Sequence, residues 1–300
     1  MLISKVNVRP ASGSSTIVVT ALRSFKHLPT LKKYNLIKPE HIHAHSFHCN
    51  HRLLRGVGTM SIAENLQGIS DRVKTAHVNS KFADNAEPTL VAVSKTKPVS
   101  DLQEVYDAGH RHFGENYMDE LVIKSAELPS DIKWHFIGHL QSNKCKDLAE
   151  IPNLYLWETC GKEKTARKMN RALESRDNKD PLLTLLQINT SEEDNKNGCA
   201  VEDAVQLARV VIEECDQLKL AGVMTIGKFG RDESERPNPD FVALLEVRAR
   251  ICDEFGFDPV SFQVSMGMSG DFEHAIELGS TNVRVGSSIF GARGKKPSAT

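Results

Sequence analysis

Short apolar runs rich in β-branched and aromatic residues alternate with helical patterns along most of this chain, from residue 61 to about residue 286. Runs of this length, bounded by turn residues, are typical of buried strands. We expect strands near residues 89–95, 111–114, 133–138, 153–157, 182–188, 219–225, 260–265 and 281–286. Eight strands alternating with helices in about 240 residues predict an α/β fold, a single (β/α)8 TIM barrel. An open doubly wound sheet is the alternative, because the strand count alone does not exclude it.

Apolar residues at helical spacing mark three of the helices expected around these strands. The first begins at Ser61 and has the apolar residues Ile62, Leu66, Ile69 and Val73. The longest stripe is Val201, Ala204, Val205, Ala208, Val211, Ile212 and Cys215. A third follows Pro237 and Pro239, with Phe241, Leu244, Leu245 and Ile251.

The first expected strand, TLVAVSK, ends in a lysine. Side chains alternate along a strand, so Val91, Val93 and Lys95 share one face, which places an ammonium at the inner, carboxyl end of an apolar strip. Burial disfavours the charged form of lysine, and the neutral amine is a nucleophile that can form a Schiff base. The alternative is a lysine that ends the strand in solvent, as most lysines are exposed.

Two turns of small residues follow the last two expected strands. The first, in MGMSGDFEHAIELG, contains Gly267, Ser269 and Gly270, and the second, in RVGSSIFGAR, contains Gly286, Ser287 and Ser288. Barrels of this kind often hold phosphate at these two positions, where backbone N–H groups and serine hydroxyls attract an anion. We interpret Asp271 as the cap of the next helix, with its carboxylate facing away from the phosphate. Two ordinary turns are the alternative.

A nucleophilic lysine and an anion cradle together indicate a phosphate-bearing aldehyde held between them. Pyridoxal 5'-phosphate has this outline. Arg284 lies two residues before Gly286 and is expected to point inward from the eighth strand. A cation that faces the pyridine nitrogen opposes protonation of the ring, whereas a carboxylate would favour it. A structural ion pair is the alternative role for Arg284.

Several motifs carry a family resemblance: AVSKTKP, FGENY, WHFIGHLQSNK, GMSGD and VRVGSSIFGAR, which lie between residues 92 and 293. The chain resembles the pyridoxal phosphate homeostasis protein family from about residue 60 to residue 293. The resemblance implies an alanine-racemase-like barrel that carries the cofactor on Lys95. It implies that Ser269, Gly286 and Ser287 hold the phosphate and that Arg284 faces the pyridine nitrogen. Further candidates for cofactor contact, assigned loosely near the barrel mouth, are Asn116, His135 and Met268, with Asn143 at another motif position.

The first 58 residues differ in composition from the rest. They hold nine Lys or Arg and one acid, about +8, against about −9 for the remainder. We therefore expect a non-core extension over 1–58, a barrel over 59–293 and a flexible tail over 294–300. The extension resembles a mitochondrial transit segment, with a disordered extension as the alternative and Met60 as a second candidate start. Its histidine-rich stretch 41–51 could gather zinc or copper, but nothing around it would hold the ligands rigid.

Composition also limits the function. A net charge of −1 argues against a nucleic-acid binder, and no apolar run approaches the length of a membrane span. Six cysteines without a C-x-x-C pair suit a reducing compartment, so we expect a cytoplasmic or mitochondrial protein.

The resemblance favours a non-catalytic protein that stores or delivers pyridoxal phosphate, with pyridoxal-phosphate-dependent apo-enzymes as partners. Alanine racemases need a second domain, and only 14 residues follow Gly286 here, so we expect a monomer without robust turnover. A racemase also needs acid and base groups on both faces of the substrate carbon. The alternatives are a racemase-like amino-acid enzyme and a cofactor-free sugar-phosphate lyase that uses the same lysine.

Overall fold

The computed structural model describes residues 60–292, apart from 177–179, 194–196, 229 and 232–234. The expected extension over 1–58, its histidine-rich stretch and the tail over 294–300 lie outside the described residues, so these domain boundaries stay predictions. Within the described part, no helix is long and apolar enough to cross a membrane. The five cysteines described there are buried and free.

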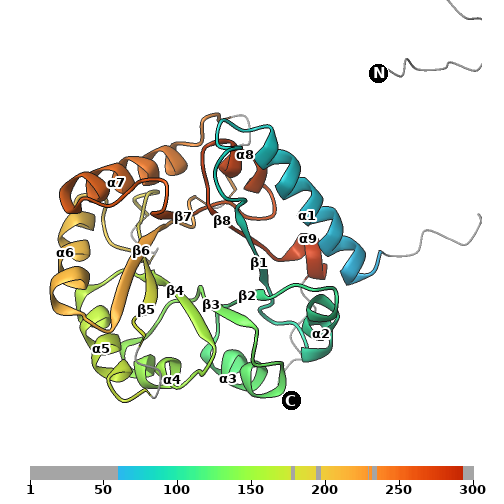
Figure 1. The fold of residues 1–300 in the computed structure, drawn as a ribbon, viewed down its shortest axis with the longest axis horizontal. Helices are drawn as coiled ribbons and strands as arrows, with labels where there is room; N and C mark the ends of the chain where they lie inside the picture. Colours follow the sequence, from blue (N-terminus) through green and yellow to red (C-terminus); the bar gives the residue numbers. More distant parts are fainter. Residues whose placement is uncertain (1–59, 177–179, 194–196, 229, 232–234, 293–300) are drawn as a thin grey trace, which may run out of the picture. The chain divides into compact units, whose positions relative to one another are not determined.

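Eight parallel strands close into a barrel in which each strand pairs with the next and β8 pairs with β1 (Figure 1). The strands are β1 (Thr89–Val93), β2 (His112–Glu115), β3 (Lys133–Phe136), β4 (Leu154–Cys160), β5 (Leu182–Gln187), β6 (Leu218–Met224), β7 (Gln263–Ser265) and β8 (Asn282–Val285). This closed order confirms the predicted barrel and excludes the open doubly wound sheet.

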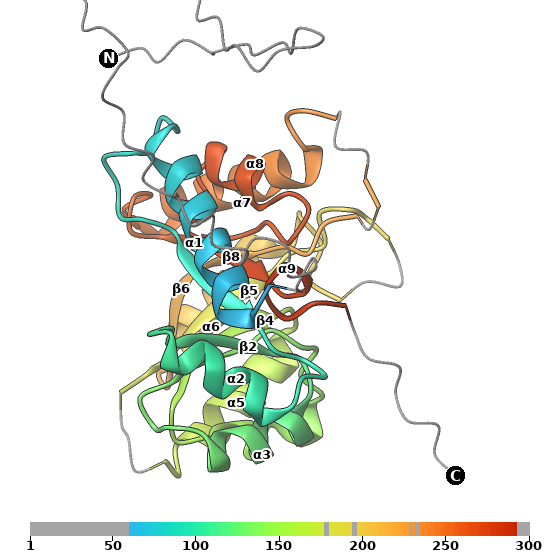
Figure 2. The same ribbon diagram turned by 90° about the vertical axis from the view of Figure 1, so that its right-hand side faces the viewer.

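Helices surround the barrel on its outside, as Figures 1 and 2 show. They are α1 (Ile62–Val78), α2 (Val99–Asp107), α3 (Met118–Glu127), the 3-10 turn η1 (Ser142–Lys144), α4 (Cys145–Ala149), α5 (Glu163–Leu173), α6 (Ala204–Glu214), α7 (Pro239–Phe255), α8 (Phe272–Glu277) and α9 (Ser287–Phe290). The helices after β7 and β8 are short, and α1, which precedes the first strand, packs against α8, α9 and α2. The leading helix therefore completes the ring.

The first helix forms where its sequence predicts. The Ser61 hydroxyl accepts from the Glu64 N–H while the Glu64 carboxylate accepts from the Ser61 N–H, a reciprocal cap that fixes the start of α1. Leu66, Ile69 and Val73 are buried against the barrel. Burial of this stripe is the main source of stability for such a helix.

The structure shortens or shifts several predicted elements, and three of these differences bear on the site or the packing. The first strand ends at Val93, not at Lys95, because the chain turns at Thr96, where φ is 63°. The strand predicted over 260–265 pairs only over Gln263–Ser265. Helix α6 begins at Ala204 rather than near residue 201, and it buries Leu207 and Val210 while Ile212 is 40% exposed, because it packs against both α5 and α7.

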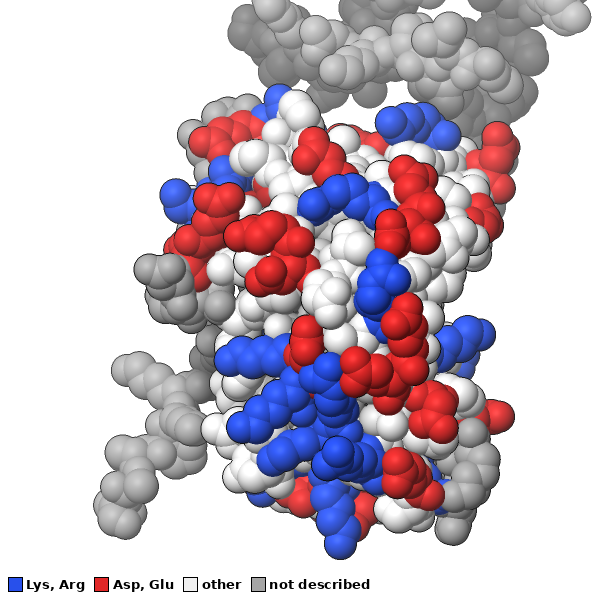
Figure 3. Space-filling model, turned by 90° about the vertical axis from the view of Figure 1, so that its left-hand side faces the viewer, with Lys and Arg blue, Asp and Glu red and all other residues white. Residues whose placement is uncertain are grey.

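Lys and Arg side chains gather on one part of the outer surface in Figure 3, where acidic side chains border them. Helix α5 alone carries Lys164, Arg167, Lys168 and Arg171. Arg167 forms ion pairs with Glu163 on its own helix and with Glu214 on α6. Such exposed pairs contribute little each, so they link neighbouring helices without determining the fold.

Gly267 gives a test of the loop after β7. Its φ is 95°, and a Cβ there would lie 2.6 Å from the Ala275 Cβ and 2.9 Å from the Phe272 Cα. We expect Gly267→Ala to lower the free energy of unfolding by more than about 1 kcal/mol, because the positive φ is unfavourable for alanine and its Cβ would clash with Ala275 and Phe272. Gly68→Ala in α1, where a Cβ would meet nothing within 4 Å, should instead stabilise by about 0.5–1 kcal/mol. Urea unfolding of both variants makes the comparison, and equal effects would contradict it.

Candidate functional site

A pocket of about 370 Å³ opens at the carboxyl ends of the strands. This volume falls within the range of about 300–1,000 Å³ that small-molecule sites occupy. Seven of the eight residues predicted to contact the cofactor line it: Lys95, Asn116, Met268, Ser269, Arg284, Gly286 and Ser287. Apolar side chains complete the described wall, among them Val93, Ile137 and Met224. The structure thus brings the lysine and both serine-bearing turns to one cavity.

Lys95 reaches this pocket from the turn that follows β1. Val93, two residues earlier, lines the same cavity, so the alternation predicted from the sequence continues past the end of the strand. Lys97 also borders the pocket, but its ammonium donates to the carbonyls of Phe290 and Ala292 at 2.7 and 3.0 Å. Of these two lysines, Lys97 thus holds the end of α9.

The turns after β7 and β8 meet through their serines. The Ser269 hydroxyl accepts from the Gly286 N–H at 3.4 Å and lies 3.3 Å from the Ser287 hydroxyl oxygen. Within the described part of the chain, the N–H groups of Ser287 and Ser288 donate to no acceptor. Hydroxyls and unengaged amides that converge on a cavity are suited to bind an anion.

Asp271 differs from its interpretation as a helix cap that faces away. It is the residue before α8, but its side chain makes no capping hydrogen bond. One carboxylate oxygen accepts from the Met268 N–H at 2.7 Å instead. The carboxylate therefore closes the loop that carries Ser269, and it uses one N–H group that an anion could otherwise have bound.

Arg284 on β8 is 5% exposed. Its guanidinium donates to the Thr225 carbonyl at 2.7 Å and to the Ser265 hydroxyl, and it lies 3.9 Å from the Glu158 carboxylate. Burial lowers the pKa of Arg284, while the charges of Glu158 and Asp271 oppose this shift. Arg284 thus lines the pocket and also forms the ion pair that the sequence left as its alternative role.

His135 does not line the pocket, in contrast to its assignment near the barrel mouth. It lies on β3 with 1% exposure, where its Nδ1 is 2.7 Å from Glu158 and its Nε2 is 2.9 Å from the His112 Nδ1. Its side chain is thus engaged inside the barrel, below the carboxyl ends. Asn143 is exposed in η1 and does not border the pocket either.

Glu158 on β4 is the centre of this interior network and was not among the site residues predicted from the sequence. Its carboxylate accepts from the Ser265 hydroxyl at 2.6 Å and from the Asn282 amide at 3.0 Å, in addition to its contact with His135. Burial would raise the pKa of Glu158, but the hydrogen bond and charge of His135, the charge of Arg284 and the Ser265 hydrogen bond lower it overall. A lone acid inside the apolar run LYLWETC was the available signal.

Asn116 follows β2 and lines the pocket with a buried side-chain oxygen that has no partner. It also borders an adjacent cavity of about 400 Å³, lined by His139, Gln141 and Lys144 among others. A buried polar atom without a partner is costly unless a ligand or water satisfies it. Asn116 is therefore placed to accept a hydrogen bond from a bound molecule.

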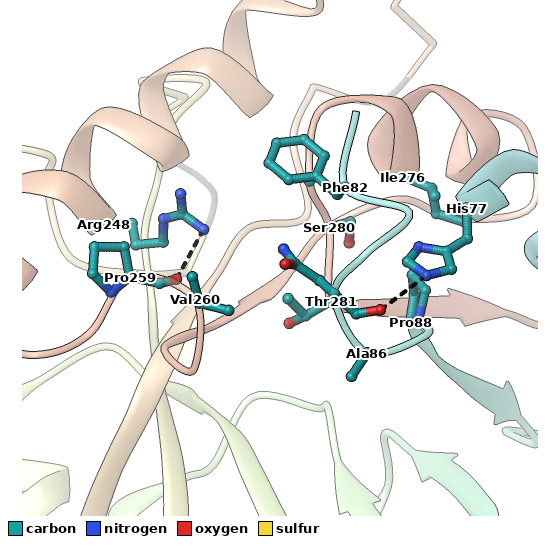
Figure 4. A pocket seen from close by; sticks show the side chains of 12 residues that line it. His77, Phe82, Ala86, Pro88, Arg248, Pro259, Val260, Ile276, Ser280 and Thr281 are labelled. Atoms are coloured by element: carbon teal, nitrogen blue, oxygen red, sulfur yellow. Dashed lines mark hydrogen bonds between the residues drawn. The ribbon is translucent and has the colours of Figure 1, made fainter. Parts of the chain in front are cut away.

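A third cavity, shown in Figure 4, lies at the opposite end, near the starts of β1, β7 and β8. Its volume is about 90 Å³. Two of its polar groups bond to nearby backbone carbonyls: Arg248 donates to the Pro259 carbonyl at 3.5 Å, and the His77 ring lies 3.2 Å from the Asn85 carbonyl oxygen. The described residues contain no group of three or more acidic, His or Cys side chains that could hold a metal ion.

Comparison with known proteins decides the family. The alanine racemase N-terminal domain family matches residues 65–294. The pyridoxal phosphate homeostasis protein of Mus musculus is 42% identical over 256 residues, 82% of this chain and 93% of the mouse protein. That of Schizosaccharomyces pombe is 46% identical over 217 residues, 72% of this chain and 89% of the yeast protein. The chain belongs to the pyridoxal phosphate homeostasis protein family.

Among solved structures, PipY of Synechococcus elongatus, determined with pyridoxal phosphate bound, superposes on this family member with a TM-score of 0.63. The two are 27% identical over 77% of this chain and the full length of PipY. An alanine racemase of Clostridium difficile, at 15% identity and a TM-score of 0.57, shares the fold. The alanine-racemase-like barrel predicted from the sequence is therefore confirmed.

The interior ion network predicts a large cost for removing one charge. Glu158→Gln leaves the buried Arg284 guanidinium without its carboxylate, and we expect a loss of about 3 kcal/mol in the free energy of unfolding. Glu163→Gln is the matched control, since it breaks an exposed pair with Arg167 and should cost less than about 0.5 kcal/mol. Chemical denaturation measures both, and a cost for Glu158→Gln as small as the control's would contradict the assignment.

Two histidines beside this network predict how stability depends on pH. Burial lowers the pKa of His110 to about 4, and burial with the nearby His135 charge lowers that of His112 to about 3, from 6.5. Between pH 6.5 and about 4 the unfolded chain binds more protons, so the free energy of unfolding should fall as the pH drops through this range. His110→Asn should make that fall less steep between urea titrations at pH 7 and pH 5. An unchanged slope would show that His110 titrates normally in the fold.

Proposed function

We propose that this protein binds pyridoxal 5'-phosphate, with Lys95 as the covalent attachment point, and serves in vitamin B6 homeostasis. The observation that carries the proposal is one cavity lined both by Lys95 and, at the neighbouring strand exit, by the turn of Gly286 and Ser287. A homologous barrel has been solved with pyridoxal phosphate bound, and the curated relatives are named for its homeostasis.

The groups in the cavity fit this cofactor. The hydroxyls of Ser269 and Ser287 and the unengaged amide of Ser288 suit the phosphate, and Asn116 supplies a buried oxygen that lacks a partner. The absence of a side chain at Gly286 lets this turn approach β1 closely, because a Cβ there would lie 3.1 Å from the Val93 carbonyl oxygen. The aldehyde of the cofactor would form a Schiff base with the Lys95 amine. The pyridine ring of the cofactor withdraws electrons from this linkage most strongly when its nitrogen is protonated.

Arg284 limits that electron withdrawal. Its guanidinium is held in place by the Thr225 carbonyl and the Ser265 hydroxyl, and it lines the same cavity. A fixed cation near the ring nitrogen opposes its protonation, so the site favours retention of the cofactor over chemistry on an amino acid.

The described wall of the pocket also supports a carrier without robust turnover. Its titratable side chains are Lys95, Lys97 and Arg284, and the Lys97 ammonium already donates to two carbonyls. Racemisation needs an acid and a base on opposite faces of the substrate carbon. An amino-acid racemase assay that shows robust turnover at catalytic concentrations of protein would overturn this part of the proposal.

The wider role of the protein is part of the same proposal. We infer that it acts as a monomer in the cytoplasm or mitochondrion and that it stores the cofactor or delivers it to pyridoxal-phosphate-dependent apo-enzymes. Light scattering of the full chain tests the oligomeric state. Transfer is tested by placing an apo-enzyme and the loaded protein on opposite sides of a membrane that passes only small molecules. Recovery of the enzyme's activity there shows release of free cofactor, whereas recovery only when the two proteins are mixed shows direct delivery.

Replacement of the two neighbouring lysines tests the attachment point. We expect the loaded protein to be yellow and to lose its colour on borohydride reduction, with a pyridoxyl group on Lys95 found by peptide mass spectrometry. Lys95→Ala should abolish the colour and the adduct. Lys97→Ala should keep both, because its ammonium holds the end of α9. A colourless wild-type protein, trapped by borohydride only with a sugar phosphate, would support the lyase instead.

A further inference from the structure

The turn that carries Lys95 has an unfavourable backbone conformation. The chain leaves β1 at Val93 and turns over residues 94–97, closed by a 3.1 Å hydrogen bond from the Lys97 N–H to the Ser94 carbonyl. Thr96, directly after Lys95, has a φ of 63°. A β-branched residue disfavours this left-handed region, so neighbouring groups must hold the turn in place.

A cluster of charged side chains from β2 and α3 holds this turn in place. Lys124 of α3 is 4% exposed, and its ammonium donates to Glu115 at 2.7 Å, to Glu120 at 2.7 Å and to the Ser94 carbonyl at 2.9 Å. These three acceptors match its three N–H donors. The side chain is therefore fixed in one orientation.

The carboxylates of the cluster bind the same turn. Glu120 accepts from the Thr96 N–H at 2.7 Å, and Glu115 accepts from the Ser94 hydroxyl at 2.6 Å. The cluster thus holds the carbonyl that precedes Lys95 and the N–H that follows it. Since the Cα of Lys95 lies between these two groups, the direction of its side chain is set by them.

We propose that Lys124, Glu115 and Glu120 are positioning residues for Lys95, which keep its amine directed into the pocket by holding the strained turn around it. The inference rests on the proposed role of Lys95 as the attachment point. Glu120 and Lys124 lie four residues apart on α3, so this helix is tied to the lysine turn through two side chains. The cluster does not line the pocket in the described structure, so it acts on the ligand only through Lys95.

Glu120→Ala is the sharpest single test. Its side chain is 30% exposed, and Lys124 keeps Glu115 and the Ser94 carbonyl, so the fold should survive. We expect the dissociation constant for pyridoxal phosphate to rise by about tenfold, as for loss of one hydrogen bond to a charged group. Adduct formation on Lys95 should slow and amide exchange at Thr96 should quicken. Glu127→Ala, an exposed acid at the end of the same helix, should change none of these.

A Thr96→Gly background shows whether Glu120 acts by holding the strained turn or by stabilising the fold in general. Glycine adopts a φ of 63° without steric cost, so a Thr96→Gly chain needs Glu120 less. We expect Glu120→Ala to lose much less affinity in the Thr96→Gly background than in the natural one. An equal loss in both would overturn the inference. Glu120→Gln retains an oxygen that can accept from the Thr96 N–H and should restore most of the affinity, and a variant as impaired as Glu120→Ala would overturn the hydrogen-bond mechanism.

Pyridoxal without its phosphate gives a readout that does not depend on the anion cradle. After borohydride reduction, the ratio of pyridoxyl label on Lys95 to that on Lys97 should fall in Glu120→Ala, with thermal unfolding as the check on folding. A natural chain that forms no adduct on Lys95 would refute the proposed function itself. If the natural chain forms the adduct on Lys95 and Glu120→Ala gives the same label ratio as the natural chain, only the positioning role is refuted.

Discussion

The pairing of β1 with β8 is the contact on which the site depends. Ala92 pairs with Val285 in parallel register, so the chain leaves both strands at the same level and on the same end of the barrel. Lys95 and Ser287 are almost two hundred residues apart in sequence, and closure of the sheet makes them neighbours on one cavity. In an open doubly wound sheet the first strand lies in the interior and is not paired with the last, so these two exits would not have met.

Charge inside the barrel is the second constraint. Four strands contribute His135, Glu158, Ser265 and Arg284 to one hydrogen-bonded row in the interior. Isolated, each charge would be expensive to bury, but together they satisfy most of their hydrogen-bonding capacity. The row also fixes Arg284, so this lining residue of the pocket is held by the protein itself before any ligand binds.

Local patterns predicted the strands, the closed barrel and the place of Lys95, because alternation and periodicity are properties of neighbouring residues. They did not predict Glu158, whose partner Asn282 is 124 residues away, nor the acceptors of Lys124. His135 shows the limit of motif matching, since its orientation follows from the register of β3 with β2 and β4. The left-handed Thr96 was also missed, because a threonine gives no signal for a positive φ.

The bond from the Lys97 ammonium to the carbonyls of Phe290 and Ala292 joins the first strand's exit to the last helical turn. These hydrogen bonds connect the turn after the first strand to the end of the last helix of the barrel, beside the cavity. A chain shortened before Phe290 would lose this link together with Gly291, which lines the cavity, so the ligand site is completed only when synthesis of the barrel is nearly finished.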